Sequence, residues 1–240
     1  MNKTAIKLAH QNTVELIGYY GGDREMACSA WTSTSRELTP EKEARIPALL
    51  KMLAENNHAT PFEKSSLHFL VTSDLASHVH FLKHRIGVSI NSESARYKEL
   101  KDDKYYVPQD WDNEEVALYV EHMENSLKAY HDCLARLVAS GMDRKRAKES
   151  ARLYLPYGNQ LTIDVMFNFR SFAHFLNLRY SKHAQLEIRE IAGEMLRQVA
   201  TIKGNDHNGP EGPSPFLHTL KAFGFMEFRD GIWQLTGPKE

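Results

Sequence analysis

The sequence predicts an α+β protein, in which helices dominate and a small antiparallel sheet supplies the strands. Apolar residues recur every three or four positions in several long stretches, which is the period of a helix. Two shorter stretches alternate apolar and polar residues, as strands do. Hydrophobic residues make up 42% and charged residues 25% of the 240 residues, values typical of globular proteins. We therefore expect one main domain with a helical majority.

The first predicted helix covers residues 40–55. Thr39 can cap it, Pro40 fits its first turn, and apolar residues recur on one face. Asn56 and Asn57 are expected to mark its end. The helix is therefore bounded by residue types that favour both of its termini.

A strand and a second helix are predicted next. Residues 65–73, SSLHFLVTS, alternate apolar side chains at Leu67, Phe69 and Val71. Ser73 can cap a helix that reaches Arg85. The triplet KHR, residues 83–85, is then expected at the end of that helix.

The central part of the chain predicts two more helices. Residues 113–140 have a helical apolar stripe, and Gly141 can terminate this long amphipathic helix. A shorter helix is expected to open near Asp143. Both helices should therefore lie close to one another along the chain.

A second strand and two further helices follow. Residues 161–169, LTIDVMFNF, alternate apolar and polar side chains and predict a strand. Arg170 is expected to lead into a helix, and the spacing of apolar residues over 188–202 predicts another. The strands are thus separated by helical segments.

The C-terminal part predicts a loop and an appendage. Residues 204–215 are rich in glycine, proline and asparagine and predict a loop. A short helix and a small hairpin around Asp230 and Gly231 should follow. We expect a main domain over residues 1–222 and an extension over 223–240.

Charge and cysteine content restrict the function. Lys and Arg number 30 against 31 Asp and Glu, so an anionic ligand must be bound by local basic clusters. The two cysteines, Cys28 and Cys133, suit a reducing compartment, and Cys133 is expected to be a core residue. The N-terminal stretch shows neither a signal peptide nor a membrane span, so a cytoplasmic location is expected.

Several common motifs are absent from the sequence. It contains no GxGxxG or Walker loop, so we expect no Rossmann or P-loop nucleotide site. The histidines lack HExxH spacing and no cysteine pair suggests zinc, so no metal is predicted.

Two polar segments come first along the chain. HATPFEK, residues 58–64, is by itself most simply a polar loop with one buried aromatic ring. In the second, Lys83, His84, Arg85 and Arg96 accompany serines and an asparagine, a mixture that suits phosphate. A solvated basic helix end is the alternative, and the serines favour a ligand.

Two further polar segments follow. Arg152, four residues before Pro156, would alone be read as a surface residue. Arg170, His174 and Asn177 share one face of the predicted helix, and Arg179 with His183 would form a second such pair. Basic residues within an apolar helix favour a shared cavity.

Together, the four segments resemble the flavin-dependent thymidylate synthases in content and order, over about residues 10–222. The family signature is Arg-His-Arg, seven residues and a serine. Here it reads Lys83, His84, Arg85, eight residues and Ser94. SARY, HATPFE, NFR and FLNLRYSKHAQLE match more closely, and His174 stands where the family can carry asparagine.

The resemblance implies a methyltransferase that acts in nucleotide biosynthesis. Deoxyuridine monophosphate (dUMP) would receive a one-carbon unit from methylenetetrahydrofolate and be reduced to thymidine monophosphate (dTMP). FAD, reduced by NADPH, would supply the hydride, and no cysteine nucleophile would be needed. The family forms homotetramers with sites between subunits. No membrane or nucleic-acid partner is expected.

The resemblance also assigns roles to residues. Arg179 would be catalytic, contacting the uracil and stabilising its ionised imide. The residues expected to bind dUMP are His80, Lys83, Ser94, Arg96, Arg152 and Arg179. Those expected to bind FAD are His58, Thr60, His84, Arg85, Asn168, Arg170, His174 and His183.

Two alternative functions remain open. A related flavin enzyme, such as a dUMP hydroxymethylase, would leave the one-carbon unit unreduced. A non-catalytic nucleic-acid-binding protein could use the same basic clusters, although the near-neutral net charge argues against it.

Overall fold

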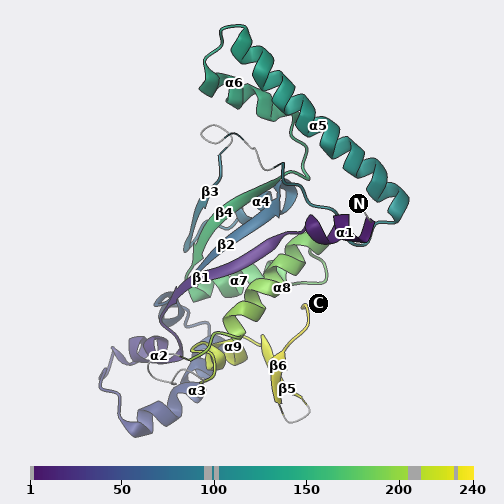
Figure 1. The fold of residues 1–240 in the computed structure, drawn as a ribbon. Coiled ribbons are helices and arrows are strands. Elements are labelled where there is room, and N and C mark those ends of the chain that lie inside the picture. Colours follow the sequence, from purple (N-terminus) through teal and green to yellow (C-terminus); the bar gives the residue numbers. More distant parts are fainter. Residues whose placement is uncertain (1–2, 95–98, 100–102, 205–211, 230–231) are drawn as a thin grey trace. The chain divides into compact units, whose positions relative to one another are not determined.

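A computed structural model describes residues 3–94, 99, 103–204, 212–229 and 232–240. The helices, labelled in Figure 1, are α1 Lys3–Ala9, α2 Asp23–Trp31, α3 Pro40–Glu55, α4 Leu75–Phe81, α5 Asn113–Ala139, α6 Arg144–Ala151, α7 Phe169–Arg179, α8 Leu186–Ala200 and α9 Leu217–Ala222. Two short 3-10 helices are η1 Thr60–Glu63 and η2 Arg152–Tyr154. The strands are β1 Thr13–Tyr20, β2 Ser66–Asp74, β3 Val88–Ser92, β4 Gln160–Phe167, β5 Met226–Arg229 and β6 Ile232–Leu235. The predicted α+β class with helices dominant is confirmed.

Four strands form one sheet in the order β1-β2-β4-β3, and β5 pairs with β6 in a separate antiparallel hairpin. The alternation that predicted β2 is confirmed, because Leu67, Phe69 and Val71 are fully buried. In β4 the buried set includes Ile163 and Val165. Each of these strands therefore turns one face towards a core.

The chain divides into two compact units. The first combines residues 1–13, 71–83 and 91–164, and the second combines residues 14–70, 84–90 and 165–240. The expected boundary between a domain over 1–222 and an extension over 223–240 stays a prediction. Within the residues that the structure describes, no helix has the length and apolar character needed to cross a membrane.

The first unit is built on α5, whose bounds match the predicted helix. Asp112 caps it, accepting hydrogen bonds from the backbone of Glu114 and Glu115, and Gly141 follows it with a φ of 91°. α6, capped by Asp143, folds back along α5 (Figure 1). In this arrangement the hydrophobic face of each helix is covered by the other helix.

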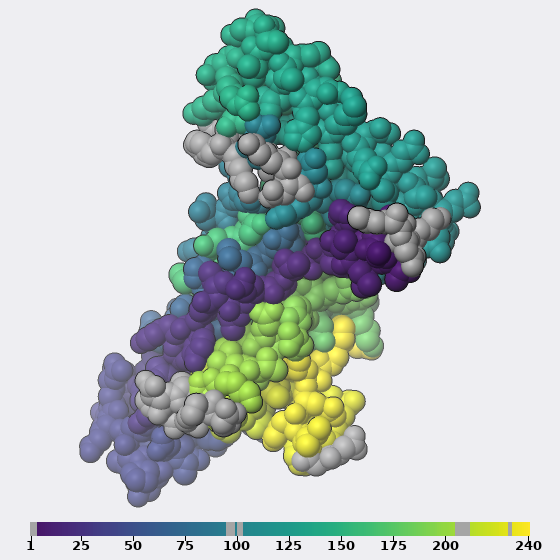
Figure 2. Space-filling model, viewed as in Figure 1, coloured from purple at the N-terminus to yellow at the C-terminus, as the bar shows by residue number. Residues whose placement is uncertain are grey.

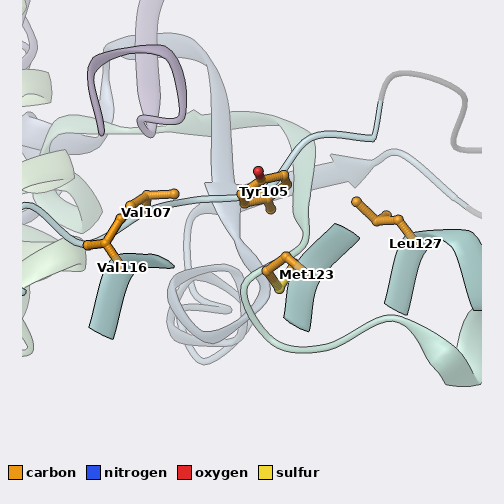
Figure 3. Packing of buried hydrophobic residues seen from close by; sticks show 5 residues of the cluster. All are labelled: Tyr105, Val107, Val116, Met123 and Leu127. Carbon is orange, nitrogen blue, oxygen red and sulfur yellow. The ribbon is translucent and has the colours of Figure 1, made fainter. Parts of the chain in front are cut away.

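Two buried clusters hold the first unit together. Tyr130 and Leu134 of α5 pack with alanines of α6, and Cys133 lies partly buried against them, as its predicted core role requires. Nearer the N-terminus of α5, the second cluster packs side chains of the helix against the segment that holds Tyr105 and Val107 (Figure 3). Its members are Tyr105, Val107, Val116, Met123 and Leu127.

The second unit has an aromatic core. Phe169 of α7 stacks on Phe216 at a centroid distance of 5.8 Å. Asp23 of α2 holds the start of α9, because its carboxylate accepts bonds from the backbone of His218 and Thr219. Burial raises the pKa of Asp23 to about 6. The C-terminal helix is thereby fixed by a buried carboxylate.

The predicted tail is confirmed as a short helix, α9, followed by the hairpin β5–β6. Lys221 lies over the ring of Trp233, with its Nζ 3.7 Å from the centroid. The expected turn residues Asp230 and Gly231 lie outside the described residues.

Three predicted boundaries were wrong. Asp74, not Ser73, caps α4, because its carboxylate accepts from Ser77 N. That helix ends at Phe81, so the KHR triplet follows it. Phe169, expected in the strand, begins α7, because Asn168 accepts a capping bond.

Sequence periodicity did not predict α1, α2, β1 or β3. β1 is an edge strand on which no residue is fully covered, and Tyr20 is 66% exposed. Figure 2 shows this purple N-terminal segment at the molecular surface. An edge strand needs less apolar alternation than a central one, which weakens its sequence signal.

Candidate active site

The start of α7 joins two of the polar segments in the second unit. Asn168 caps the helix, its Oδ1 accepting from Ser171 N at 2.9 Å. Phe169 N donates to Ser65 Oγ at 3.1 Å, and Arg170 Nη1 donates to Glu63 Oε1 at 2.6 Å. The HATPFEK segment and the NFR segment therefore meet at one helix terminus.

The residues after the KHR triplet lie against the same terminus. Asn168 N donates to the carbonyl oxygen of Gly87 at 3.1 Å, and Ser171 Oγ donates to that of Ile86 at 2.6 Å. Gly87 has a φ of 64°, a left-handed conformation that favours glycine. Three of the four predicted segments thus converge around the N-terminus of α7.

His84 and Arg179 are directly bonded. Arg179 Nε donates to His84 Nε2 at 3.1 Å, which requires the ring proton of a neutral His84 to sit on Nδ1. The His84 ring is buried and lies 5.9 Å from the His174 ring and 5.0 Å from that of Phe175. The assigned catalytic arginine is thus oriented by a residue of the assigned flavin set.

Partial burial affects the electrostatics of Arg179. Desolvation lowers the pKa of Arg179 from its ordinary value, yet a guanidinium remains protonated in a protein. Because it is half-buried, its charge is screened less by water than that of an exposed arginine. It is therefore suited to stabilise a developing anion.

A pocket of about 210 Å³ lies along one face of α7. Arg170, His174 and Asn177 all line it, so their predicted common face is confirmed. Its wall includes Phe223, from the expected extension, and Lys239 Nζ donates to Asn177 Oδ1 at 2.7 Å. The C-terminal residues therefore support this pocket, a role that sequence patterns did not indicate.

The other assigned flavin residues lie at the surface. His58 precedes η1 and Thr60 begins it, and both are exposed, as is Arg85. The predicted helical pairing of Arg179 with His183 is wrong, because α7 ends at Arg179. His183 lies in the following turn, where its backbone N–H donates to Ser181 Oγ.

In the first unit, the assigned dUMP residues lie at the ends of separate elements. His80 belongs to the last turn of α4, and Lys83 N donates to His80 O at 3.3 Å. Ser94 follows β3, and the exposed Arg152 begins η2. Arg96 lies outside the described residues.

The segment leading to Ser94 is anchored by a histidine that the sequence did not single out. Ser92 Oγ donates to the carbonyl of Glu93 at 3.1 Å and lies 3.3 Å from His78 Nε2. Because a hydroxyl has one proton, His78 Nε2 is the donor to Ser92. Glu93 pairs with Thr162, its N donating to Thr162 O at 2.9 Å and its Oε2 accepting from Thr162 N at 2.8 Å.

The environment of His78 predicts a pH effect on stability. Burial lowers the pKa of His78 from its ordinary value of 6.5, opposed by the Asp74 carboxylate. A lowered folded-state pKa gives stability that is present above the unfolded value and lost as pH falls. We expect the free energy of unfolding, from urea titrations, to fall more in the wild type than in His78→Gln between about pH 7.5 and about pH 5.5.

The glutamine variant retains an amide donor for Ser92 but does not titrate. His122→Gln, an exposed change on α5, controls for the loss of an arbitrary histidine. Parallel pH curves for the wild type and His78→Gln would contradict the assignment of a buried neutral imidazole.

The sequence of this chain is similar to those of several known proteins. Residues 15–203 match the family model described as thymidylate synthase complementing protein. A flavin-dependent thymidylate synthase of Clostridium tetani is 34% identical over 189 residues, which cover 73% of this chain and 74% of the relative. A protein of the same name from Streptomyces coelicolor is 30% identical over 194 residues, covering 72% and 77%.

A solved protein structure is also similar to this chain over most of its length. The UMP/dUMP methylase PolB from Streptomyces cacaoi, bound with 5-Br dUMP, superposes with a TM-score of 0.71 at 26% identity. The similarity covers 89% of this chain and 95% of that one. The fold, the convergence of three motifs at α7 and the sequence matches thus agree, and the chain belongs to the flavin-dependent thymidylate synthase family.

Proposed function

We propose that this enzyme catalyses the reductive methylation of dUMP to dTMP, with methylenetetrahydrofolate as one-carbon donor and FAD, reduced by NADPH, as hydride carrier. The convergence of the KHR loop, the HATPFEK segment and Arg179 around α7 is the observation that carries the proposal. The names of the relatives and of the structural neighbour support it.

The residues around α7 fit a flavin nucleotide. Asn168 and Arg170 supply donors at the helix start, and His174 adds a ring on the pocket face. Amide and guanidinium donors suit a pyrophosphate. The backbone at Gly87 can approach Asn168 and Ser171 closely only because no Cβ is present. We propose that FAD, which supplies the hydride when bound, is held by His58, Thr60, His84, Arg85, Asn168, Arg170, His174 and His183.

Arg179 is proposed to act on the uracil ring. A guanidinium beside the ring would stabilise negative charge that develops on the imide as the ring becomes nucleophilic. His84 holds the guanidinium through the Nε bond, so its orientation is fixed before substrate arrives. Preorganisation of this kind reduces the reorganisation needed during reaction.

We propose that residues of the first unit make the remaining contacts to dUMP. The residues that would hold dUMP with Arg179 are His80, Lys83, Ser94, Arg96 and Arg152. Lys83 stands where the family has an arginine, whose guanidinium can form two parallel hydrogen bonds to a phosphate. The Lys83 ammonium is a point charge, so it can neutralise a phosphate but cannot bind it through two such bonds. Anchoring of the segment before Ser94 by His78 supports a fixed position for that hydroxyl.

A cysteine nucleophile is not part of the proposal. Cys28 and Cys133 are half-buried, and Cys133 packs against the cluster between α5 and α6. We further propose a homotetramer with sites between subunits, for which light scattering of the purified protein is the test.

The test of the function is a flavin spectrum. The purified protein should be yellow, and its flavin absorbance should change when dUMP is added, because substrate binding alters the surroundings of the ring. Colourless protein that cannot be reconstituted with FAD would rule the proposal out.

Product analysis identifies the reaction. A methylated product carries one oxygen less than a hydroxymethylated one, so mass spectrometry separates dTMP formation from hydroxymethylation. UMP is tested beside dUMP, because the structural neighbour is named for both substrates. We expect the methylated product from dUMP; a hydroxymethylated product would contradict the proposed reduction.

A further inference from the structure

A second polar depression lies along the outer face of α2. Its volume is about 640 Å³, which is in the range of sites for nucleotide-sized ligands. α2 contributes Arg24, Glu25, Cys28 and Ser29, which share one side of the helix. The inner side instead buries Met26 and Ala27 completely. The depression is therefore the side of α2 that the core does not use.

Three cations surround this depression. Arg24, on α2, is joined by Arg36, from the segment after α2, and by Lys64, which follows η1. Glu25 supplies the one carboxylate of the lining, and Arg24 is already paired with Glu43, its Nε lying 4.0 Å from Glu43 Oε1. Within the part of the chain that the structure describes, neither Arg36 nor Lys64 has a carboxylate partner. The surplus positive charge favours an anionic ligand.

Aromatic and hydroxyl groups complete the lining. Tyr20, at the end of β1, is 66% exposed, and an exposed ring offers a face on which a flat base can stack. Ser29 and Thr32 also line the depression. Thr32 Oγ1 already donates to Cys28 O at 3.2 Å, so Ser29 supplies the hydroxyl that can donate to a phosphate oxygen. A cationic side and an aromatic side in one depression match the two ends of a nucleotide.

We propose that this depression binds a nucleotide, with a phosphate on Arg36 and Lys64 and the base on Tyr20. None of its lining residues belongs to the sets assigned to FAD or dUMP, so the proposal adds a site to this chain. A metal ion is a poor alternative occupant, since the lining has a single carboxylate among three cations. An apolar ligand would leave Arg36 and Lys64 desolvated without a carboxylate partner.

The probe for the test is adenosine 2′,5′-bisphosphate, which has two phosphomonoester groups and an aromatic base. Its binding to the full chain is measured by calorimetry with saturating FAD and dUMP present, so that both proposed sites are occupied. Arg36→Gln and Lys64→Gln should each weaken binding roughly five-fold, and together they should weaken it more. Tyr20→Ala should weaken binding, whereas Tyr20→Phe should not, because only the ring face is used.

Arg45→Gln is the matched control. It removes one positive charge from an exposed position on α3, outside the lining. Unchanged probe affinity in the Arg36 and Lys64 variants would overturn the site, as would an equal loss in Arg45→Gln, which would indicate a long-range charge effect. Inorganic phosphate that binds as tightly as the probe would overturn the role of Tyr20.

Two properties of the experiment make its result interpretable. All substituted side chains are exposed, so the variants should fold, and thermal unfolding checks this. The readout depends on neither flavin absorbance nor turnover. A protein that binds the probe but never binds FAD would refute the proposed function alone, and a protein that methylates dUMP but shows no probe binding would refute this inference alone.

Discussion

Arg179→Ala should lower kcat by about two to three orders of magnitude while FAD remains bound. The reason is electrostatic: removal of a half-buried guanidinium takes away the charge proposed to stabilise the ionised imide. Its position on α7 is fixed by the Nε bond to His84. Single-turnover oxidation of reduced enzyme by dUMP and methylenetetrahydrofolate measures the chemical step, and flavin absorbance measures occupancy.

Two control variants distinguish the loss of the Arg179 charge from other structural effects of the substitution. Arg197→Ala changes an arginine of α8 that pairs with Glu194, and its kcat should stay close to the wild-type value. His84→Gln tests whether the loss comes only from release of His84. If Arg179→Ala retains near-normal turnover, the role assigned to the Arg179 charge is wrong. A loss of kcat in His84→Gln with FAD still bound would measure the contribution of the orienting bond.

The helices that the sequence predicted well have strong local signals. The bounds of α3 match residues 40–55, because Thr39 accepts a capping bond and apolar residues recur along one face. For α5, a cap at Asp112 and a glycine beyond the end define both termini. Such signals act within a few residues, so they can be read without tertiary information.

The elements that the sequence missed depend on tertiary context. β1 is an edge strand with no fully covered side chain, and its pairing rather than its pattern makes it a strand. Asp74 outcompetes Ser73 as the cap of α4 because Asn12 also bonds to it, through Asn12 Nδ2 at 2.9 Å. Asn12 is 62 positions away in sequence, so local reasoning could not include it.

The candidate site was predictable in content but not in geometry. His84 and Arg179 were both singled out as polar residues in unusual surroundings, yet they are 95 positions apart. Only folding shows that one orients the other. His78 was missed altogether, because a single histidine on a short helix has no distinguishing pattern, and its importance comes from burial and from the bond to Ser92.

Gly87→Ala should destabilise the protein by about 2–3 kcal/mol and weaken FAD binding at least roughly ten-fold. A φ of 64° costs a residue with a Cβ about 1–2 kcal/mol. The added Cβ would also lie closer to Asn168 Nδ2 and Ser171 Oγ than van der Waals contact allows. One of these groups must move, and Asn168 provides the helix cap, worth about 1 kcal/mol.

Gly224→Ala is a matched control in the same unit. Its φ is 72°, yet a Cβ there would meet nothing within 4 Å, so it carries the backbone penalty without the clash. Urea unfolding should therefore show Gly87→Ala as the less stable variant, and flavin titration should show weaker binding for it alone. Equal stabilities and equal FAD affinities would mean that the contact between the KHR loop and the start of α7 does not shape the flavin site. The expected difference would instead tie FAD affinity to the close approach of backbone and cap that only glycine permits at position 87.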